Sequence, residues 1–216
     1  MNRKRIFALA FAVLMLLALA ACGTKNNDKM GDMSGNGSAM TDEPKNAEEA
    51  LTLHKELLEQ ENAILSENTE LWSSILEAGR LAPTAKNLQE QHIYVVQSAE
   101  GLAKIDKLTP CRYGAPTVLV VAFNKDSVFT YPGGKHSSGA EDAAIVATHL
   151  MLAATNAAVD SCWINFFDPE AAAKALGLPE NEEVLMLLDL GHAAEDGKPL
   201  PNHSSRKALT ETVSYL

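Results

Sequence analysis

One short stretch in the first half of the chain combines a proline with several side chains that form hydrogen bonds. Residues 82–89 read APTAKNLQ, after a helix-like run over 71–81 and before an apolar, strand-like segment over 92–96. Pro83 ends the helix, because proline disfavours helical geometry in the residue before it. The hydroxyl of Thr84 and the amide of Asn87 can then donate hydrogen bonds to the polar edge of a ligand. The alternative is a helix end followed by solvated polar residues.

Three further stretches carry residues that could take part in chemistry. Residues 111–116 read CRYGAP and lead into a β-branched run over 117–123, and residues 161–164 read SCWI. Near the C-terminus, residues 203–211 read HSSRKALTE and contain the adjacent cations Arg206 and Lys207. The planar guanidinium of arginine suits bidentate hydrogen bonding to an anion better than the ammonium group of lysine does.

The elements expected around these stretches alternate between helices and strands. The pattern predicts helices over 47–69, with a break near 66–69, and over 70–81, 99–108, 140–158 and 169–176. It predicts strands over 92–96, 117–123, 160–167 and 183–190, with a polar, Gly-rich loop over 126–139 and an apolar tail over 213–216. Such an alternation indicates an α/β or α+β sandwich of two or three layers.

These stretches together resemble the nitroreductase family of flavin enzymes. Residues 82–89 match its A-P-[ST]-x-x-N-x-Q motif, residues 161–164 resemble its G-x-x-S-C-W-[IV] strand, and residues 203–211 resemble its closing [KR]-x-P-L-x-E-x-[VI] segment. The resemblance covers roughly 71–216. It implies an α+β fold, the nitroreductase-like three-layer α/β sandwich, and a homodimer that holds two FMN molecules at the subunit interface.

The resemblance also implies roles for particular residues. The loop of residues 82–89 would lie against the isoalloxazine ring of an FMN molecule that the partner chain mainly binds. Gln89 would support the loop. The residues in contact with the ring would be Pro83, Thr84, Ala85 and Asn87. The backbone of the strand that carries Cys162 and Trp163 would approach the reactive edge of the flavin. Arg206, or else Lys207, would pair with the FMN phosphate. Packing of Trp163 in the core and a solvated basic pair at 206–207 are the alternatives.

The chain departs from the family pattern in two places. Nothing matches the N-terminal R-R-S-x-R-x-[FY] segment whose arginines and serine grip the FMN phosphate, and the corresponding stretch 53–62 is acidic. Arg80, Lys86 or Arg112 could replace the lost cations. Val159 and Asp160 stand where family members tend to have glycine, which alters the approach to the flavin.

The resemblance implies hydride transfer from NAD(P)H or another donor, through FMN, to nitroaromatic, quinone or related acceptors. No dedicated catalytic side chain is expected, since the cofactor carries the redox chemistry. A non-catalytic flavin- or ligand-binding surface protein is the alternative that the missing arginines favour. A reductive dehalogenase-like variant of the same fold also stays open.

The first 22 residues have the pattern of a bacterial lipoprotein signal peptide. Three cations at 3–5 precede an apolar run over 6–19, and residues 19–23 read LAACG, which resembles a lipobox with Cys22 as the lipidated residue. The run is shorter than the ~20 residues that span a bilayer, which favours cleavage over an uncleaved anchor. A flexible linker over 23–46 would then tether a domain over 47–216, with an atypical Glu-rich helix over 47–69, to the extracytoplasmic face of a bacterial cell membrane.

Charge and cysteine content narrow the remaining classes. The formal net charge is −10, with 28 acidic against 18 basic residues, which argues against a nucleic-acid partner and against electrostatic adhesion to anionic lipid. Besides Cys22, the chain has Cys111 and Cys162, which could pair in an extracytoplasmic setting or remain buried thiols. No zinc-type cluster is present in the sequence, so no metal is expected.

Overall fold

The computed structural model describes residues 46–194 and 197–216. The chain divides after Glu56, and the unit that follows, Leu57–Leu216, contains the whole sheet. The predicted signal peptide and nearly all of the predicted linker lie outside the described residues, so both remain predictions. Within the described residues, no helix combines the length and the apolar character needed to cross a membrane.

Asparagine side chains cap the first two helices. Helix α2 covers Ala47–Glu67, and the side-chain oxygen of Asn46 accepts a hydrogen bond from the Glu49 amide at 2.9 Å. Helix α3 covers Thr69–Arg80 and is capped in the same way by Asn68. The predicted break between the two helices is therefore confirmed, and Asn68 is the residue at which the second one starts.

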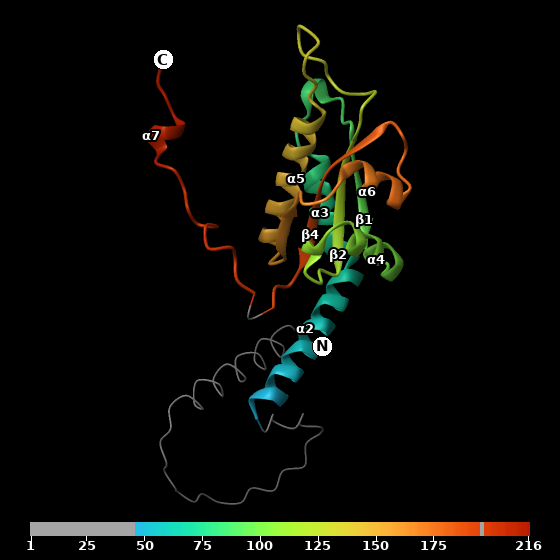
Figure 1. Ribbon diagram of the computed structural model, residues 1–216, viewed down its shortest axis with the longest axis vertical. Helices are drawn as coiled ribbons and strands as arrows, with labels where there is room; N and C mark the ends of the chain where they lie inside the picture. The colour runs from blue at the N-terminus through green and yellow to red at the C-terminus, as the bar shows by residue number, and fades with distance from the viewer. Residues whose placement is uncertain (1–45, 195–196) are drawn as a thin grey trace, which may run out of the picture. The chain divides into compact units, whose positions relative to one another are not determined.

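The four strands form one antiparallel sheet in the order β1-β2-β4-β3. Figure 1 labels β1, β2 and β4. Their bounds are Gln91–Val96 for β1, Thr117–Asn124 for β2, Asp160–Ile164 for β3 and Glu182–Gly191 for β4. Strand β2 is buried from Thr117 to Phe123, as its continuous β-branched run predicts. The two central strands therefore have both faces covered, and β1 and β3 form the edges.

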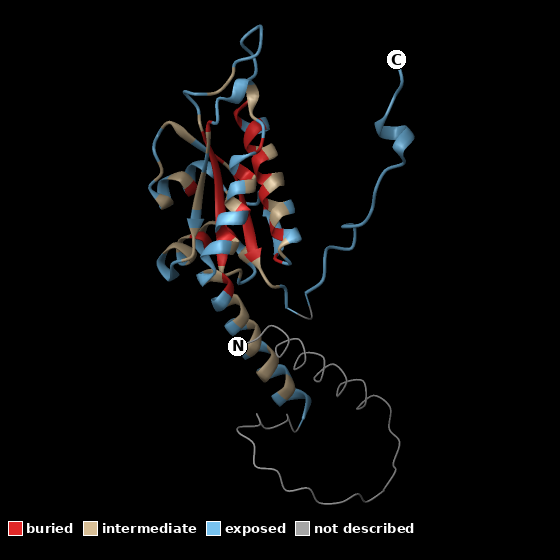
Figure 2. Ribbon diagram, turned by 180° about the vertical axis from the view of Figure 1, so that it is seen from behind, coloured by how far each residue is buried: buried red, intermediate tan, exposed pale blue. Residues whose placement is uncertain are grey.

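Helices cover both faces of the sheet and make three layers. Helix α5, Gly139–Asn156, packs with α3 on one face, in a core that includes Ile75, Leu119 and Leu150. Helices α4, Ala99–Leu108, and α6, Pro169–Leu176, cover the other face around Ile105 and Leu187. The buried residues lie in the sheet and on the sides of the helices that face it (Figure 2). The predicted three-layer α+β sandwich is confirmed.

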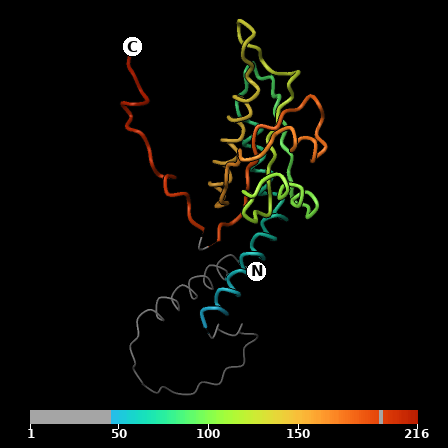
Figure 3. Tube along the Cα trace, in the orientation of Figure 1, coloured from blue at the N-terminus to red at the C-terminus, as the bar shows by residue number. Residues whose placement is uncertain are grey.

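Some bounds differ from the sequence-based expectation for identifiable reasons. Strand β3 ends at Ile164, three residues earlier than predicted, because the side chain of Asn165 forms two hydrogen bonds there. Its oxygen accepts from the Trp163 indole, and its nitrogen donates to the Leu185 carbonyl. Helix α5 ends at Asn156, since Ala158 takes a left-handed φ of 58°. The segment between β2 and α5 projects beyond the sheet as a loop (Figure 3), as its composition predicts.

Candidate functional site

The loop of residues 82–89 is short, contorted and tied down by its own hydrogen bonds. It contains a single 3₁₀ turn, η1 (Ala85–Asn87), and Lys86, Asn87 and Gln89 have φ values of 54°, 56° and 54°. Non-glycine residues rarely adopt this left-handed region, which costs each of them roughly 1–2 kcal/mol. The Thr84 hydroxyl accepts a hydrogen bond from the backbone amide of Gln89 at 3.0 Å and so closes the loop.

Helix α5 anchors this loop from below. The amide of Ala85 donates to the Oδ1 atom of Asp142 at 3.0 Å, and Asp142 lies in the first turn of α5 with 3% of its surface exposed. On the outer side, the ammonium of Lys86 lies 4.7 Å from the centre of the Phe129 ring, a cation–π contact. The loop therefore has a defined shape, with the side chain of Asn87 on its exposed surface.

The second predicted stretch lies at a cavity on the far side of the sheet. Cys162 lines a cavity of about 320 Å³ together with Asn62, Arg112, Tyr113, Asp189 and His192. Cys162 pairs with Asp189 across β3 and β4, and Asp189 pairs with Val118, so all three side chains point to the face that α4 and α6 cover. Trp163 points to the opposite face and is 39% exposed, so it is not a core residue. Both Cys111 and Cys162 are free thiols.

Asp189 is the most unusual group in this cavity. It is 3% exposed, and neither of its carboxylate oxygens has a hydrogen-bond partner among the described residues. Burial raises the pKa of Asp189 to about 7; the Arg112 guanidinium opposes this shift and Asp106 adds to it. Burial, with the nearby Asp189 charge, also raises the pKa of the Cys162 thiol. A buried carboxyl without a donor, facing a cavity, is suited to a ligand that brings an N–H group.

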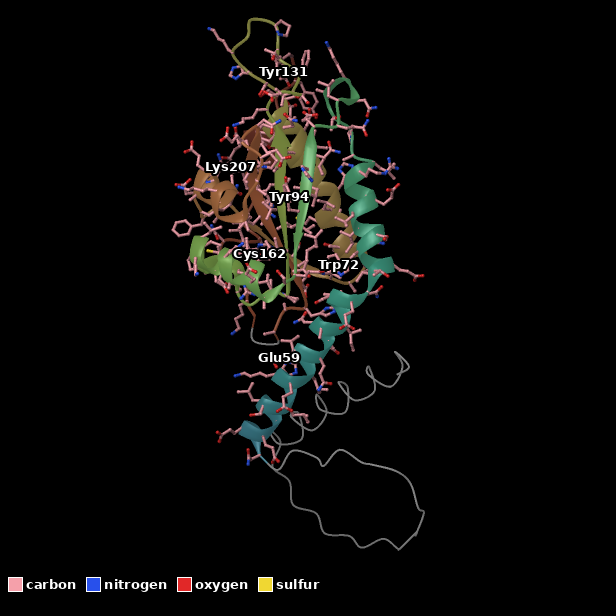
Figure 4. The ribbon with its side chains drawn as sticks, turned by 90° about the vertical axis from the view of Figure 1, so that its right-hand side faces the viewer. Glu59, Trp72, Tyr94, Tyr131, Cys162 and Lys207 are labelled. Carbon is pink, nitrogen blue, oxygen red and sulfur yellow. The ribbon has the colours of Figure 1, made fainter. Side chains whose placement is uncertain are left out.

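The loop and the cavity lie at opposite ends and opposite edges of the sheet. The loop precedes Gln91, the first residue of β1, which pairs with Phe123. Cys162 on β3 lies in the row of paired residues that runs through Asp189 and Val118 to Val96, the last residue of β1. With strands about 4.8 Å apart and ~3.4 Å of rise per residue, the two places are roughly 20 Å apart. In Figure 4, Tyr131 lies toward one end of the sheet and Cys162 toward the other; the ring of Tyr131 contacts that of Phe129, over which Lys86 of the loop lies. One chain does not bring these two predicted parts together.

The third predicted part lies on the C-terminal segment. Every residue over 197–216 is exposed, and the segment contains one short helix, α7 (Leu209–Thr212), which the sequence did not indicate. One guanidinium nitrogen of Arg206 donates to the carbonyls of His203 and Ser205, each at 2.7 Å. Lys207 is exposed beside it. Both cations are therefore accessible to a partner.

The cations that could replace the missing N-terminal arginines already have partners within the chain. Arg80 forms a bidentate pair with Glu77, at 2.6 Å for both bonds. Arg112 binds both carboxylate oxygens of Asp106 and the Ala115 carbonyl, at 2.6–2.8 Å. Lys86 lies over Phe129. Their engagement leaves Arg206 and Lys207 as the stronger candidates for a phosphate group.

Comparison with known proteins decides the family. Residues 68–111 and 111–192 match the sequence pattern of the nitroreductase family, which is more than half of the chain. The chain belongs to the nitroreductase family. A nitroreductase family protein from Clostridium difficile 630 has a similar structure, with a TM-score of 0.63 and 33% sequence identity over 68% of this chain and 86% of that one.

Two other relatives extend the comparison. A protein of Archaeoglobus fulgidus named "Putative NADH dehydrogenase/NAD(P)H nitroreductase" is 28% identical over 128 residues, 56% of this chain and 72% of that protein. A nitroreductase-like protein of Exiguobacterium sibiricum, crystallised with FMN, shares the fold with a TM-score of 0.58 and 20% identity, covering 69% of this chain and 87% of that one. The predictions of an oxidoreductase of this family and of FMN as its cofactor are confirmed.

Sequence reasoning missed three buried carboxyl groups beside the predicted site residues: Asp189 at the cavity, and Glu90 and Asp142 by the loop of residues 82–89. Asp189 interrupts an otherwise apolar strand, MLLDLG, and that interruption was the signal available for it. Asp142 stands in the first turn of an Ala-rich helix, where an acidic residue is ordinary, so nothing marked its contact with the loop. Glu90, next to the loop motif, is 4% exposed, although glutamate is seldom buried.

We expect Asp189→Asn to change how stability depends on pH. The folded pKa of Asp189, about 7, lies above its unfolded value near 3.9, so the folded state holds a proton that the unfolded state releases. The free energy of unfolding of the wild type therefore falls as pH rises from about 4 to about 7, and it stays reduced above that. Asparagine at position 189 does not titrate, so the free energy of unfolding of the variant does not fall in this way.

Thermal unfolding at pH 5 and pH 8 measures this effect. The melting temperature of Asp189→Asn relative to wild type is expected to be higher at pH 8 than at pH 5. Asp126→Asn, at an exposed turn, is the matched control and should show no such difference. A difference between Asp189→Asn and wild type that is equal at the two pH values would contradict the assignment.

Proposed function

We propose that this protein is a lipid-anchored homodimeric oxidoreductase that uses FMN to transfer a hydride from NAD(P)H, or another donor, to nitroaromatic, quinone or related acceptors. The observation that carries the proposal is the separation of roughly 20 Å between the loop of residues 82–89 and the Cys162 strand. Because a single flavin ring cannot reach both from one chain, each site takes its loop from the partner. Homodimers with twofold symmetry build two such sites at once.

The residues at the cavity suit the polar edge of a flavin. The unpaired Asp189 carboxyl can accept a hydrogen bond from an N–H of the ring system, and protonated it can donate one. A volume of about 320 Å³ is at the lower end for a small-molecule site, which agrees with a cavity completed by a second chain. When bound, FMN supplies the redox chemistry, accepting a hydride from the donor and passing it to the acceptor.

The chain's own residues have the tasks of binding and orienting. The partner's loop would present Thr84, whose hydroxyl already accepts from Gln89 and so keeps its own proton for donation. Pro83 and Ala85 would supply apolar contact beside it, and Asn87 an amide. Strand β3 would bring the backbone near Cys162 and Trp163 to the ring. Arg206 and Lys207, both exposed, would hold the phosphate.

A lipid anchor is proposed from the sequence alone. The cationic start, the short apolar run and the small residues before Cys22 support cleavage and acylation at that cysteine. Acyl chains at one position, two or more in number, hold a protein stably on a membrane. The protein would then act at the extracytoplasmic face, where a membrane quinol or a reduced protein is an alternative donor to NAD(P)H.

The second candidate function is a ligand-binding surface lipoprotein without turnover. The acidic helix α2, in place of the family's arginine-rich segment, is the observation that favours it. Purified protein separates the two, since both would bind a flavin but only the enzyme would oxidise a donor.

Binding of FMN and riboflavin to the full chain in detergent tests the flavin site and its phosphate contact. The wild type is expected to show bound-flavin bands in the visible spectrum and saturable quenching of FMN fluorescence. Arg206→Gln removes charge-assisted hydrogen bonds worth ~1.5–3 kcal/mol each, so the Kd for FMN should rise about tenfold or more, with the Kd for riboflavin unchanged. Lys198→Gln, an equal charge change on the same exposed segment, is the control.

The outcomes of this titration are distinct. Absence of bands and of quenching at high FMN concentration would overturn the oxidoreductase proposal. Equal weakening of FMN and riboflavin by Arg206→Gln would remove Arg206 from the phosphate site and leave the flavin site standing.

The anchor is tested by the mass of the protein recovered from bacterial membranes. The wild type is expected to begin at Cys22 and to carry acyl chains, whereas Cys22→Ser should remain an unprocessed, unacylated precursor. Cys162→Ser serves as the control for a cysteine outside the signal. A wild-type chain that still begins at Met1, or that is cleaved elsewhere without acylation, would contradict the lipoprotein proposal.

A further inference from the structure

Two buried carboxyl groups lie directly beneath the loop of residues 82–89. Glu90 follows the loop and is 4% exposed, and Asp142, in the first turn of α5, is 3% exposed. Ser138, just before α5, is fully buried beside them. Burial of two acidic side chains without a basic partner is unfavourable unless one of them is neutral.

Each carboxyl group of this pair accepts one hydrogen bond on one of its oxygens. The amide of Phe129 donates to the Ser138 hydroxyl at 3.2 Å, and that hydroxyl donates to Oε1 of Glu90 at 3.1 Å. At the other end, the Ala85 amide donates to Oδ1 of Asp142 at 3.0 Å. Oε1 of Glu90 and Oδ1 of Asp142 thus each have a donor.

The second oxygen of each carboxyl group has no donor. Oε2 of Glu90 and Oδ2 of Asp142 are buried and have no hydrogen-bond partner among the described residues. Ser138 links the two groups, since its hydroxyl donates to Glu90 and its carbonyl accepts from the Asp142 backbone amide at 2.7 Å. A single proton between Oε2 of Glu90 and Oδ2 of Asp142 completes the pattern. Burial, and then the neighbouring Asp142 carboxyl group, raises the pKa of Glu90, which favours Glu90 as the group that holds the proton.

The loop needs such an anchor. Three of its residues have left-handed backbone geometry, and conformations of this kind persist only where the surroundings over-determine them. The Ala85 amide is the point at which α5 holds the loop backbone, through Asp142. If Asp142 turned away to relieve repulsion from an ionised Glu90, the loop would lose this contact.

We propose that Glu90 and Asp142, sharing one proton, are positioning residues that hold the flavin-contacting loop in its binding shape. That the loop contacts a flavin rests on the proposed function, but the anchoring of the loop by this pair does not depend on it. Neither residue touches the loop's outer surface, so their effect reaches a ligand only through Ala85 and the residues that follow it.

The anchor is sensitive to rising pH. Because the pKa of Glu90 is raised in the folded state, its contribution is present at low pH and is lost as pH rises through the folded pKa. Other charged or titratable groups near the pair are Glu141 and Tyr131, which bond to each other, Lys86 on the Phe129 ring, and His92 and Glu182, which pair at 2.7 Å. These groups have partners of their own.

Hydrogen exchange of the FMN-free full chain in detergent tests the anchor directly. After correction for intrinsic rates, protection of the peptide over 84–91 in the wild type should fall by about tenfold or more between pH 4.5 and 9.5, as pH rises through the folded pKa of Glu90. Glu90→Gln keeps a neutral donor for Asp142 and an acceptor for Ser138, so its protection should not change with pH. Glu90→Ala should lose protection at both pH values, and Glu183→Gln, at an exposed position of β4, should behave as wild type.

Flavin binding supplies the second readout. The Kd of the wild type for FMN should rise with pH over the same interval, whereas that of Glu90→Gln should stay flat. Equal pH dependence of loop protection in wild type and Glu90→Gln would overturn the shared-proton anchor. A pH-dependent loop in a protein that binds no FMN would leave the anchor in place and overturn the proposed function instead.

Discussion

The structure depends on the burial of the middle of its two central strands. With helices on both faces of β2 and β4, the buried side chains there must be apolar, and all but Thr117 and Asp189 are. Polar chemistry is therefore confined to the two ends and two edges of the sheet, where loops and edge strands reach solvent. The loop of residues 82–89 lies at one end, and the cavity beside Cys162 lies at the other.

This constraint gives meaning to the carboxyl groups that violate it. Asp189 occupies a position on β4 that burial would assign to an apolar residue, and its carboxyl lacks a partner within the described chain. Glu90 and Asp142 are as deeply buried, but they satisfy each other with one shared proton. Exceptions to local rules concentrate at functional sites, and here all three adjoin parts that a flavin would contact.

Much of the fold could be predicted from residue patterns. The β-branched run of β2, the Ala-rich α5 and the Asn caps of α2 and α3 are local signals, and the structure follows them. The sheet order and the antiparallel pairing could not be read in this way, because they depend on contacts between distant segments. The loop motif was recognisable, but its support by Asp142, 57 positions away from Ala85, leaves no local trace. The left-handed φ values at Lys86 and Gln89 carry no sequence signal either, since these residue types rarely adopt that geometry, whereas asparagine at 87 adopts it more readily.

The central claim is that the loop of one chain completes the cavity of another, and thiol crosslinking tests it most directly. In an Asn87→Cys variant, a bifunctional thiol reagent too short to join residue 87 to Cys162 within one chain should still yield a covalent dimer. The same variant with Cys162→Ser should yield none, and bound FMN should slow the reaction. Recovery of monomer alone, or of dimers that persist without Cys162, would contradict a site built from two chains.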